Sequence, residues 1–394
     1  MKCDVLVIGA GPAGSSAAYW LARFGAAVIL ADKAHFPRDK PCGDGLAPGV
    51  EEMLTSMGLD DFLHTHGKPI QGIHLFSPEH PRTTISFESS GESNRRGWVL
   101  PRYLLDEALS KKASSAGALF LPDFYAKTPV YNQSQLEGVL GVQGKREVKV
   151  STHLVIVATG ANREFIRSAS LYTPRPPEAL ATRTYLEGLS NLDNFIQIYL
   201  DRDLIPGYGW VFPTGEDRAN IGCGVILNGR STQEGSRHLR SCMRQLLHHV
   251  QGGKHLMPEK PKGYLIRSDF PNAPLVAGGM LVIGETAGLV DPITGEGIGL
   301  ALRSGWLAAR VASYALSVGD FTSLPLKVYE DALRHMFAEY FIEARQFLSW
   351  LNEPGVTDRM IQESKSNPAV SRALKLAIID KSPGQGMLAL KEML

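Results

Sequence analysis

Residues 5–32 read VLVIGAGPAGSSAAYWLARFGAAVILAD, and this stretch decides the fold. The apolar run Cys3–Ile8 is typical of a buried parallel strand. It leads into the glycine turn 9–14, then into a helix rich in small residues that ends at Gly25, and then into a second apolar strand that ends at Asp32. A strand, a glycine turn, a helix and a second strand in this order predict a Rossmann-like α/β unit.

The glycine turn GAGPAG has the GxGxxG spacing of a dinucleotide-binding motif. Gly9 allows the tight turn, Gly11 lets the backbone approach a pyrophosphate, and Gly14 lets the helix pack close to the strand. Pro12 and Ala13 begin the helix, whose free N–H groups and positive dipole end attract phosphate. The turn therefore predicts a phosphate-binding site at the start of the helix.

Asp32 ends the second strand, at roughly the 20-residue spacing after the first glycine that suits a carboxylate holding ribose hydroxyls. Lys33 follows directly and is counted with the cofactor-binding residues. Because the two strands, the helix and the acid agree with the glycine turn, we predict dinucleotide binding rather than an ordinary glycine-rich loop. This unit alone leaves NAD and FAD as alternatives.

Length and composition narrow the possible size, partners and cellular location of the protein. Its 394 residues suit two or three packed lobes, and the formal charge of +1 disfavours nucleic acid as a partner. The four cysteines show no CxxC pair and no metal-ligand spacing, which predicts reduced thiols, no bound metal and a cytoplasmic protein. We identify no signal peptide and no apolar run of ~20 residues, so any membrane contact is expected to be peripheral.

A second glycine-rich segment favours FAD over NAD. Residues 280–283 read as an apolar strand and lead into GETAG at 284–288. The segment DPITGEGIG at 291–299 then opens a helix. The N–H groups at this helix start could stabilise negative charge on a reduced flavin ring.

Four segments together resemble the geranylgeranyl reductase family, within the larger group of flavoproteins similar to para-hydroxybenzoate hydroxylase. They are GAGPAGSSAA at the start, FPRDKPCGDGLAP at 36–48, YGWVFP with ANIGCG at 208–224, and GETAGLVDPITGEGIGLALRSG at 284–305. The family usually has GDA where this chain has Gly284-Glu285-Thr286, and that aspartate is expected to hold the ribitol chain of FAD. Glu285 keeps the carboxylate but is one methylene longer.

The resemblance implies a set of FAD-binding residues. Arg38 is expected to contact FAD phosphate or substrate, and Arg102 to reach the cofactor from a helix start; the alternatives are a surface arginine and a surface salt bridge with Asp106. The whole predicted set is Gly9, Gly11, Pro12, Ala13, Gly14, Asp32, Lys33, Arg38, Cys42, Gly43, Arg102, Gly160, Gly284, Glu285, Pro292, Gly295, Gly297 and Ile298.

The predicted catalytic residues are Cys42, Gly43, Tyr208 and Trp210. The resemblance implies that the Cys42-Gly43 pair lies near the flavin ring, where a thiol could donate a proton; the alternative is a small residue packed in a tight loop. The large residues of YGWVFP alternate along a strand, which suits one face turned toward a cavity. The alternative for Tyr208 and Trp210 is sheet core.

The predicted fold class is α/β, with a Rossmann-like FAD-binding lobe interleaved with a mixed-sheet substrate lobe and a C-terminal helical region. We assign residues 1–60, 95–165 and 275–330 to the FAD-binding lobe. Residues 61–94 and 166–274 are assigned to the substrate lobe. Residues 331–394 form the helical region, because apolar and aromatic residues recur there at helical spacing.

The function implied by the resemblance is an FAD-dependent reductase that saturates carbon–carbon double bonds of an isoprenoid. The substrate classes are a geranylgeranyl-type lipid, a chlorophyll side chain or a menaquinone tail, and the reductant is NAD(P)H or a ferredoxin. One alternative is a flavin monooxygenase or halogenase acting on an aromatic or carrier-bound substrate. Tyr208 and Phe212 depart from the WxWxIP of flavin halogenases, which counts against halogenation. A second alternative is a non-catalytic prenyl-binding protein.

Overall fold

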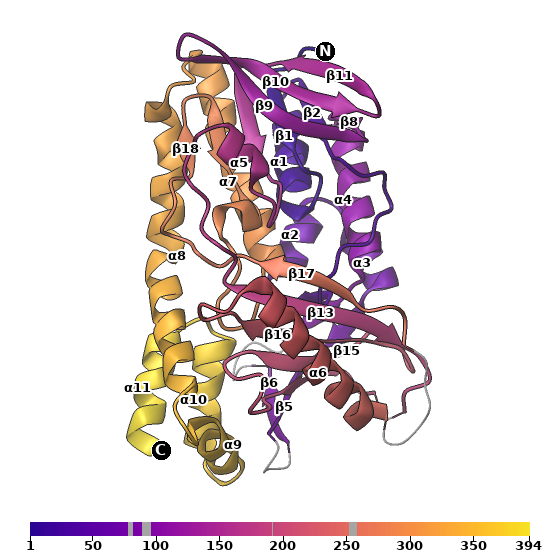
Figure 1. The fold of residues 1–394 in the computed structure, drawn as a ribbon, viewed down its shortest axis with the longest axis vertical. Helices are drawn as coiled ribbons and strands as arrows, with labels where there is room; N and C mark the ends of the chain where they lie inside the picture. Colours follow the sequence, from indigo (N-terminus) through magenta and orange to yellow (C-terminus); the bar gives the residue numbers. More distant parts are fainter. Residues whose placement is uncertain (78–81, 89–95, 191, 252–257) are drawn as a thin grey trace.

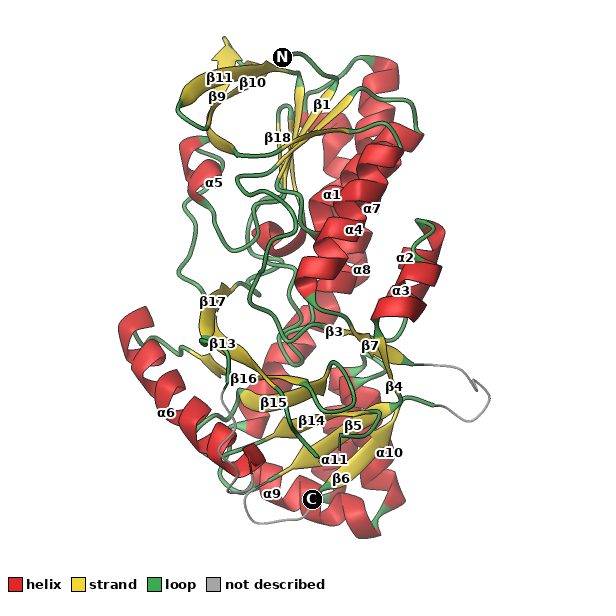
Figure 2. Ribbon diagram, turned by 90° about the vertical axis from the view of Figure 1, so that its right-hand side faces the viewer, coloured by secondary structure: helices red, strands yellow, loops and turns green. Residues whose placement is uncertain are grey.

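The computed structural model of the protein describes residues 1–77, 82–88, 96–190, 192–251 and 258–394 (Figure 1). Two main sheets lie one above the other along the long axis of the molecule (Figure 1). The upper sheet has six strands and carries the dinucleotide turn, and the lower sheet has seven strands. Loops run between the two sheets (Figure 2). This arrangement places the glycine turn at the junction between the lobes.

The six-stranded sheet begins with the predicted strand–turn–helix unit. Strand β1 (Val5–Ile8) pairs in parallel with β2 (Val28–Ala31) on one side and with β12 (Leu154–Val157) on the other, and all three are buried. Two parallel strands and one short antiparallel strand complete the sheet. Its order is β18 (Val276–Ala277), β19 (Met280–Val282), β12 (Leu154–Val157), β1 (Val5–Ile8), β2 (Val28–Ala31) and β8 (Leu119–Leu121).

Three helices of this lobe pack together beside the sheet: α1 (Pro12–Arg23), α4 (Arg102–Ser115) and α7 (Ile298–Val318). Helix α1 ends two residues before the predicted Gly25, because Phe24 already leaves the helical conformation and Gly25 has a φ of +90°. Helices α1 and α7 approach closely, since a Cβ on Gly305 would lie 2.3 Å from the Ala13 carbonyl oxygen. The close contact brings two predicted helix starts together: the start of α1, expected to face phosphate, and the start of α7, expected to face the flavin.

The seven-stranded sheet is mostly antiparallel, with one parallel pair between β14 (Phe195–Tyr199) and β5 (Gly72–Phe76). Helix α6 (Thr232–Gln251) packs against β13 and β16 (Figure 2). The strand order is β17 (Lys262–Ile266), β13 (Ala179–Leu186), β16 (Ala219–Ile226), β15 (Tyr208–Pro213), β14 (Phe195–Tyr199), β5 (Gly72–Phe76) and β6 (Thr83–Ser86).

Smaller elements complete the two lobes. A three-stranded antiparallel sheet contains β9 (Phe124–Asn132), β10 (Gln135–Gln143) and β11 (Arg146–Ser151). A second one contains β3 (Gly45–Leu46), β7 (Gly97–Val99) and β4 (Lys68–Ile70). The short helices are α2 (Val50–Ser56), α3 (Asp60–His66), α5 (Glu164–Ser168) and the 3₁₀ turn η1 (Gly284–Ala287).

The C-terminal part of the chain is helical. It consists of α8 (Ser323–Leu351), α9 (Val356–Ser366), α10 (Pro368–Ile378) and α11 (Pro383–Met393). Buried side chains of α8 to α11 share one apolar cluster with side chains of the seven-stranded sheet. Among the described helices, none has the length and apolar character needed to cross a membrane.

The predicted fold class is confirmed, including the interleaved lobes and the C-terminal helical region. The lobe boundaries themselves stay predictions. The predicted boundary at residues 94 and 95 lies outside the described part of the chain. The strand predicted over residues 280–283 is β19, Met280–Val282, and the GETA segment after it forms the 3₁₀ turn η1.

Candidate functional site

A cavity of about 2290 Å³ lies where the two lobes meet and is lined by residues from both large sheets. All predicted cofactor-binding and catalytic residues line it except Gly14 and Gly284. These two glycines pack beneath the lining: a Cβ on Gly14 would lie 1.8 Å from the Gly9 carbonyl oxygen, and one on Gly284 would lie 2.8 Å from the Ala13 Cβ. The structure therefore brings the predicted residues together, while their individual roles stay predictions.

The dinucleotide turn has the geometry that its glycines require. Gly9 has a φ of +103°, and a Cβ there would lie 2.2 Å from the Ala158 carbonyl oxygen. Gly11 caps α1 and has no side chain that could accept from the first N–H groups of that helix, and no other side chain in the described part of the chain is seen to cap them. Asp32 is buried and accepts hydrogen bonds from the backbone N–H groups of Ala10 (2.7 Å) and Ala34 (2.9 Å). The free helix start suits an anion.

Two arginines converge on this turn and share one carboxylate. Arg102 donates to Asp106 through two nitrogens, each at 2.8 Å, and Arg38 lies 2.9 Å from the same carboxylate. A Cβ on Gly11 would lie 3.7 Å from Arg38 Nη2 and 4.0 Å from Arg102 Nη2. Two guanidinium groups share one buried carboxylate, so Asp106 leaves one guanidinium charge beside the turn that it does not neutralise.

The ion pair of Arg102 with Asp106 differs from the surface salt bridge that the sequence left as an alternative. Arg102 is 4% exposed and Asp106 is fully buried. Burial alone would lower the pKa of the Arg102 guanidinium, but the Asp106 carboxylate raises that pKa, so the group stays charged. Together with the uncapped α1, this charge fits the pyrophosphate of a bound dinucleotide such as FAD.

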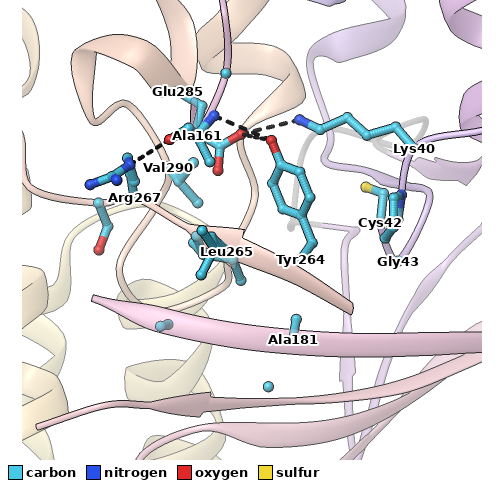
Figure 3. A pocket seen from close by; sticks show the side chains of 18 of the residues that line it. Lys40, Cys42, Gly43, Ala161, Ala181, Tyr264, Leu265, Arg267, Glu285 and Val290 are labelled. Carbon is cyan, nitrogen blue, oxygen red and sulfur yellow. Dashed lines mark hydrogen bonds and ion pairs between the residues drawn. The ribbon is translucent and has the colours of Figure 1, made fainter. Parts of the chain in front are cut away.

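Glu285, which stands where the resembled family has aspartate, is held by residues from two other parts of the chain (Figure 3). Its carboxylate accepts hydrogen bonds from Lys40 Nζ at 3.1 Å and from Tyr264 Oη at 3.0 Å. The Lys40 ammonium also lies 4.4 Å from the centre of the Tyr264 ring. We call Lys40, Tyr264 and Glu285 the lysine cluster.

The lysine cluster was not predicted. Lys40 belongs to the CGDGL-containing loop, Tyr264 to β17 and Glu285 to η1, so only the tertiary fold joins them. Burial alone would lower the pKa of Lys40, but the Glu285 carboxylate and the Tyr264 hydroxyl raise it, and the side chain is an ammonium at neutral pH. The cluster ties three elements of the cavity wall together.

The loop before β3, residues 36–44, carries Cys42 and is called the cysteine loop. Asn220 of β16 donates to the Cys42 carbonyl oxygen at 2.7 Å, and Trp210 Nε1 donates to Asn220 Oδ1 at 3.0 Å. Gly43 lies directly against these side chains, since a Cβ there would lie 3.0 Å from the Phe212 ring and 3.4 Å from Trp210 Nε1. Trp210 therefore supports the cysteine loop as well as lining the cavity.

The Cys42 thiol stays protonated at neutral pH. Burial raises the pKa of this thiol, while the Arg102 guanidinium and the Asp44 backbone N–H act in the opposite direction. The net shift is upward, which suits a proton donor and disfavours a standing thiolate nucleophile.

Asp44 is a further buried group of the cysteine loop that sequence reasoning did not single out. It is fully buried and accepts hydrogen bonds from Asn220 Nδ2 (2.8 Å), the Arg102 backbone N–H (3.2 Å) and the Tyr185 hydroxyl. Burial raises the pKa of Asp44 from 3.8 to about 6, against the lowering effect of these donors and of Arg183. The signal was a carboxylate within the CGDGL motif, but its burial depends on β13 and β16.

The other helix start in the cavity belongs to α7. Tyr208 of β15 donates its hydroxyl hydrogen to the Thr294 carbonyl oxygen and so joins the seven-stranded sheet to the PITGEG segment. Glu296 accepts from the Gly299 N–H at 2.5 Å, so one of the first amide donors of α7 is already used. Lys381, between α10 and α11, pairs with the buried Asp291, which directly precedes this segment.

Comparison with known proteins supports FAD binding by this chain. The chain matches the FAD binding domain family over residues 2–310. It is 33% identical over 331 residues to a digeranylgeranylglycerophospholipid reductase of Methanoculleus marisnigri, with 83% of this chain and 80% of that protein covered. It is 31% identical over 319 residues to a menaquinone reductase of Mycobacterium tuberculosis, with 79% of this chain and 76% of that protein covered.

Solved structures share the fold over nearly the whole chain. A geranylgeranyl bacteriochlorophyll reductase-like protein of Thermoplasma acidophilum superposes with a TM-score of 0.84 at 24% identity, and 99% of each chain is covered. A flavin-dependent brominase superposes with a TM-score of 0.78 at 18% identity, over 100% of this chain and 99% of that chain. Both likenesses concern the fold. The chain belongs to the FAD binding domain family and, within it, to the geranylgeranyl reductase-like FAD-dependent oxidoreductases.

Proposed function

We propose that this protein reduces carbon–carbon double bonds of an isoprenoid chain, using FAD held in the cavity between the lobes. One observation carries the proposal: a single cavity joins the dinucleotide turn to an apolar wall made by the seven-stranded sheet and the C-terminal helices. At about 2290 Å³ it exceeds the roughly 300–1,000 Å³ of a site for one small molecule. Its apolar lining includes Ile70, Ile73, Phe87, Ile196, Trp210, Phe212, Ile226, Leu348, Ile378 and Ile379.

The FAD-binding roles in this proposal follow from the cleft geometry. The first turn of α1, together with Arg38 and Arg102, would hold the pyrophosphate, because uncapped N–H groups and excess positive charge meet there. Asp32 would hold the ribose, since each of its oxygens keeps acceptor capacity beyond its single backbone hydrogen bond. Glu285 and the PITGEG segment at the start of α7 would border the flavin.

When bound, reduced FAD supplies the hydride equivalent. The residues of this chain position the substrate and supply the proton. Cys42 would give its Sγ proton to the carbon that does not receive hydride, and the thiolate left behind would regain a proton from water. An isolated double bond needs such assistance, because hydride alone attacks it poorly. Tyr208 and Trp210 would hold the chain over the reacting edge and exclude water.

The proposal is tested by reducing the FAD-loaded protein without oxygen and then adding single candidate oxidants. A geranylgeranyl lipid or a quinone with a prenyl tail is expected to reoxidise the flavin and to gain two hydrogen atoms per double bond. A monooxygenase or halogenase would instead leave the prenyl compounds intact and react with oxygen. A protein that cannot be loaded with FAD would support the non-catalytic prenyl-binding alternative.

Two further parts of the proposal concern the electron donor and the location of the protein. The reductant is NAD(P)H bound transiently or a ferredoxin, and anaerobic bleaching of the flavin by each donor distinguishes them. We also propose a cytoplasmic protein with peripheral membrane contact, because long isoprenoid lipids reside in membranes. Sedimentation with lipid vesicles, at low and at high salt, tests that contact.

A further inference from the structure

Asp44 stands out among the buried groups that the proposed mechanism does not use. It is a fully buried, non-glycine residue with a φ of +66°, a left-handed conformation that costs of order 1 kcal/mol or more for an L-residue. Such a conformation persists only where the surroundings hold it. Here the holding contacts are hydrogen bonds to its own side chain.

The Asp44 carboxylate is held from three separate elements. The Arg102 backbone N–H belongs to the start of α4, the Tyr185 hydroxyl to β13, and the Asn220 amide to β16. Its backbone also takes part, since the Leu100 N–H donates to the Asp44 carbonyl oxygen at 2.9 Å. Asp44 thus fastens the cysteine loop to both lobes.

The same contacts reach Cys42. The Asn220 Nδ2 that donates to Asp44 also donates to the Cys42 carbonyl oxygen, at 2.7 Å. The Asp44 backbone N–H lowers the pKa of the Cys42 thiol, and the charge of the Asp44 carboxylate raises it. Two opposite charges therefore influence the thiol: Arg102 favours the thiolate, and Asp44 favours the thiol.

We propose that Asp44 is a positioning residue that orients Cys42 and keeps its sulfur protonated by the charge of a buried carboxylate. The proposal rests on the proposed function, in which the Cys42 thiol is the proton source. Burial is the first reason why a thiol beside the Arg102 guanidinium does not ionise, and the proposal adds the charge of Asp44 as a second reason.

The charged and titratable groups around this pair define how it responds to pH. Arg102 of α4 faces the thiol, Tyr185 and Arg183 of β13 face the carboxylate, and Lys40 lies along the cysteine loop. The pKa of Asp44, about 6, makes the carboxylate negative at pH 7 and neutral near pH 5. Asp44 and Cys42 therefore titrate as a coupled pair.

The test follows the rate of Cys42 alkylation by iodoacetamide from pH 6 to 10 in the FAD-loaded protein, read by peptide mass. Only the thiolate reacts, so the rate reports the thiol pKa. The buried Cys3, Cys223 and Cys242 are internal references. Asp44→Asn is expected to lower the Cys42 pKa and to raise its rate at pH 7 by about tenfold, the factor for one pKa unit.

The matched control is Asp39→Asn, which removes another carboxylate of the same loop. Asp39 pairs with Lys262 and with Arg183, and its loss leaves Arg183 free to act on Asp44, which keeps the Asp44 carboxylate negative. The Asp39→Asn variant is therefore expected not to accelerate Cys42 alkylation. Equal acceleration in both variants, or a wild-type profile in Asp44→Asn, would overturn the proposal.

If Asp44→Asn does not bind FAD, the variant Tyr185→Phe tests the role of Asp44 instead. It removes one donor to the carboxylate without changing any charge, which raises the Asp44 pKa further and leaves more of it neutral at pH 7. Cys42 alkylation should then also accelerate at pH 7, and an unchanged rate would count against Asp44. This readout needs no isoprenoid, so its failure is distinct from a failure to reduce prenyl compounds.

Discussion

The lysine cluster is expected to hold the cysteine loop closed through coupling between Lys40 and Glu285. Their side chains are 23% and 12% exposed and lie 3.1 Å apart. This pair is less exposed than a surface ion pair, worth about 0–1 kcal/mol, and less buried than one whose disruption costs about 3–5 kcal/mol. We therefore expect a coupling energy of about 1–2 kcal/mol for opening of the loop, or about 5- to 30-fold in the opening equilibrium.

The perturbation is a double-mutant cycle with Lys40→Met, Glu285→Gln and both changes together. The assay is hydrogen exchange of the peptide that covers residues 36–48, read by mass spectrometry, because local opening limits exchange there. Each single variant is expected to exchange faster, and the double variant should exchange less fast than the two single effects would predict together.

Lys262→Met is the matched control. Lys262 also pairs with the cysteine loop, through Asp39 at 2.5 Å, but its side chain is 50% exposed. Its removal should therefore accelerate exchange less than removal of Lys40 does. Strictly additive effects of Lys40→Met and Glu285→Gln would refute the inferred coupling, and so would an equal effect of Lys262→Met.

Three further predictions concern stability and cofactor binding. Because the folded-state pKa of Asp44, about 6, exceeds 3.8, the folded protein binds a proton at this group before the unfolded chain does. The contribution of Asp44 to the free energy of unfolding should therefore rise by about 2 kcal/mol from pH 7 to pH 4, and Asp44→Asn should lose it in melting temperatures compared across pH. An unaltered slope would contradict it. Gly14→Ala should weaken FAD binding about tenfold or more, since the new Cβ meets a carbonyl oxygen at 1.8 Å; wild-type affinity in a fluorescence titration would show that the turn tolerates it. Arg102→Ala leaves the buried Asp106 with Arg38 alone and should cost about 3–5 kcal/mol in unfolding free energy, more than Arg38→Ala; the reverse order in chemical denaturation would refute this.

Local patterns were sufficient to predict the fold class and the dinucleotide turn. The spacing of Gly9, Gly11 and Gly14 carries its own physical reason, because each glycine answers a steric requirement within a few residues or against the next strand. The helices after residue 297 also follow from periodicity. These features depend on neighbours in sequence, which is why sequence alone could predict them.

The contacts that complete the site depend on distant pairing. Lys40 and Glu285 are 245 residues apart, and Asp44 and Asn220 are 176 residues apart. Whether Asp44 is buried or solvated depends on how β13 and β16 pair, and the sequence does not state that register. Likewise, only the structure accounts for the longer side chain of Glu285, because its carboxylate accepts hydrogen bonds from Lys40 and Tyr264.

The central claim is that this FAD-dependent oxidoreductase saturates isoprenoid double bonds with a proton from Cys42. The most direct measurement is a single anaerobic turnover of the reduced, FAD-loaded protein with a geranylgeranyl lipid, with the product read by mass spectrometry. We predict a product with two added hydrogen atoms per reduced bond in wild type, and a much slower reaction in Cys42→Ala that retains bound FAD. An unreduced lipid, or equal rates for wild type and Cys42→Ala, would contradict the account.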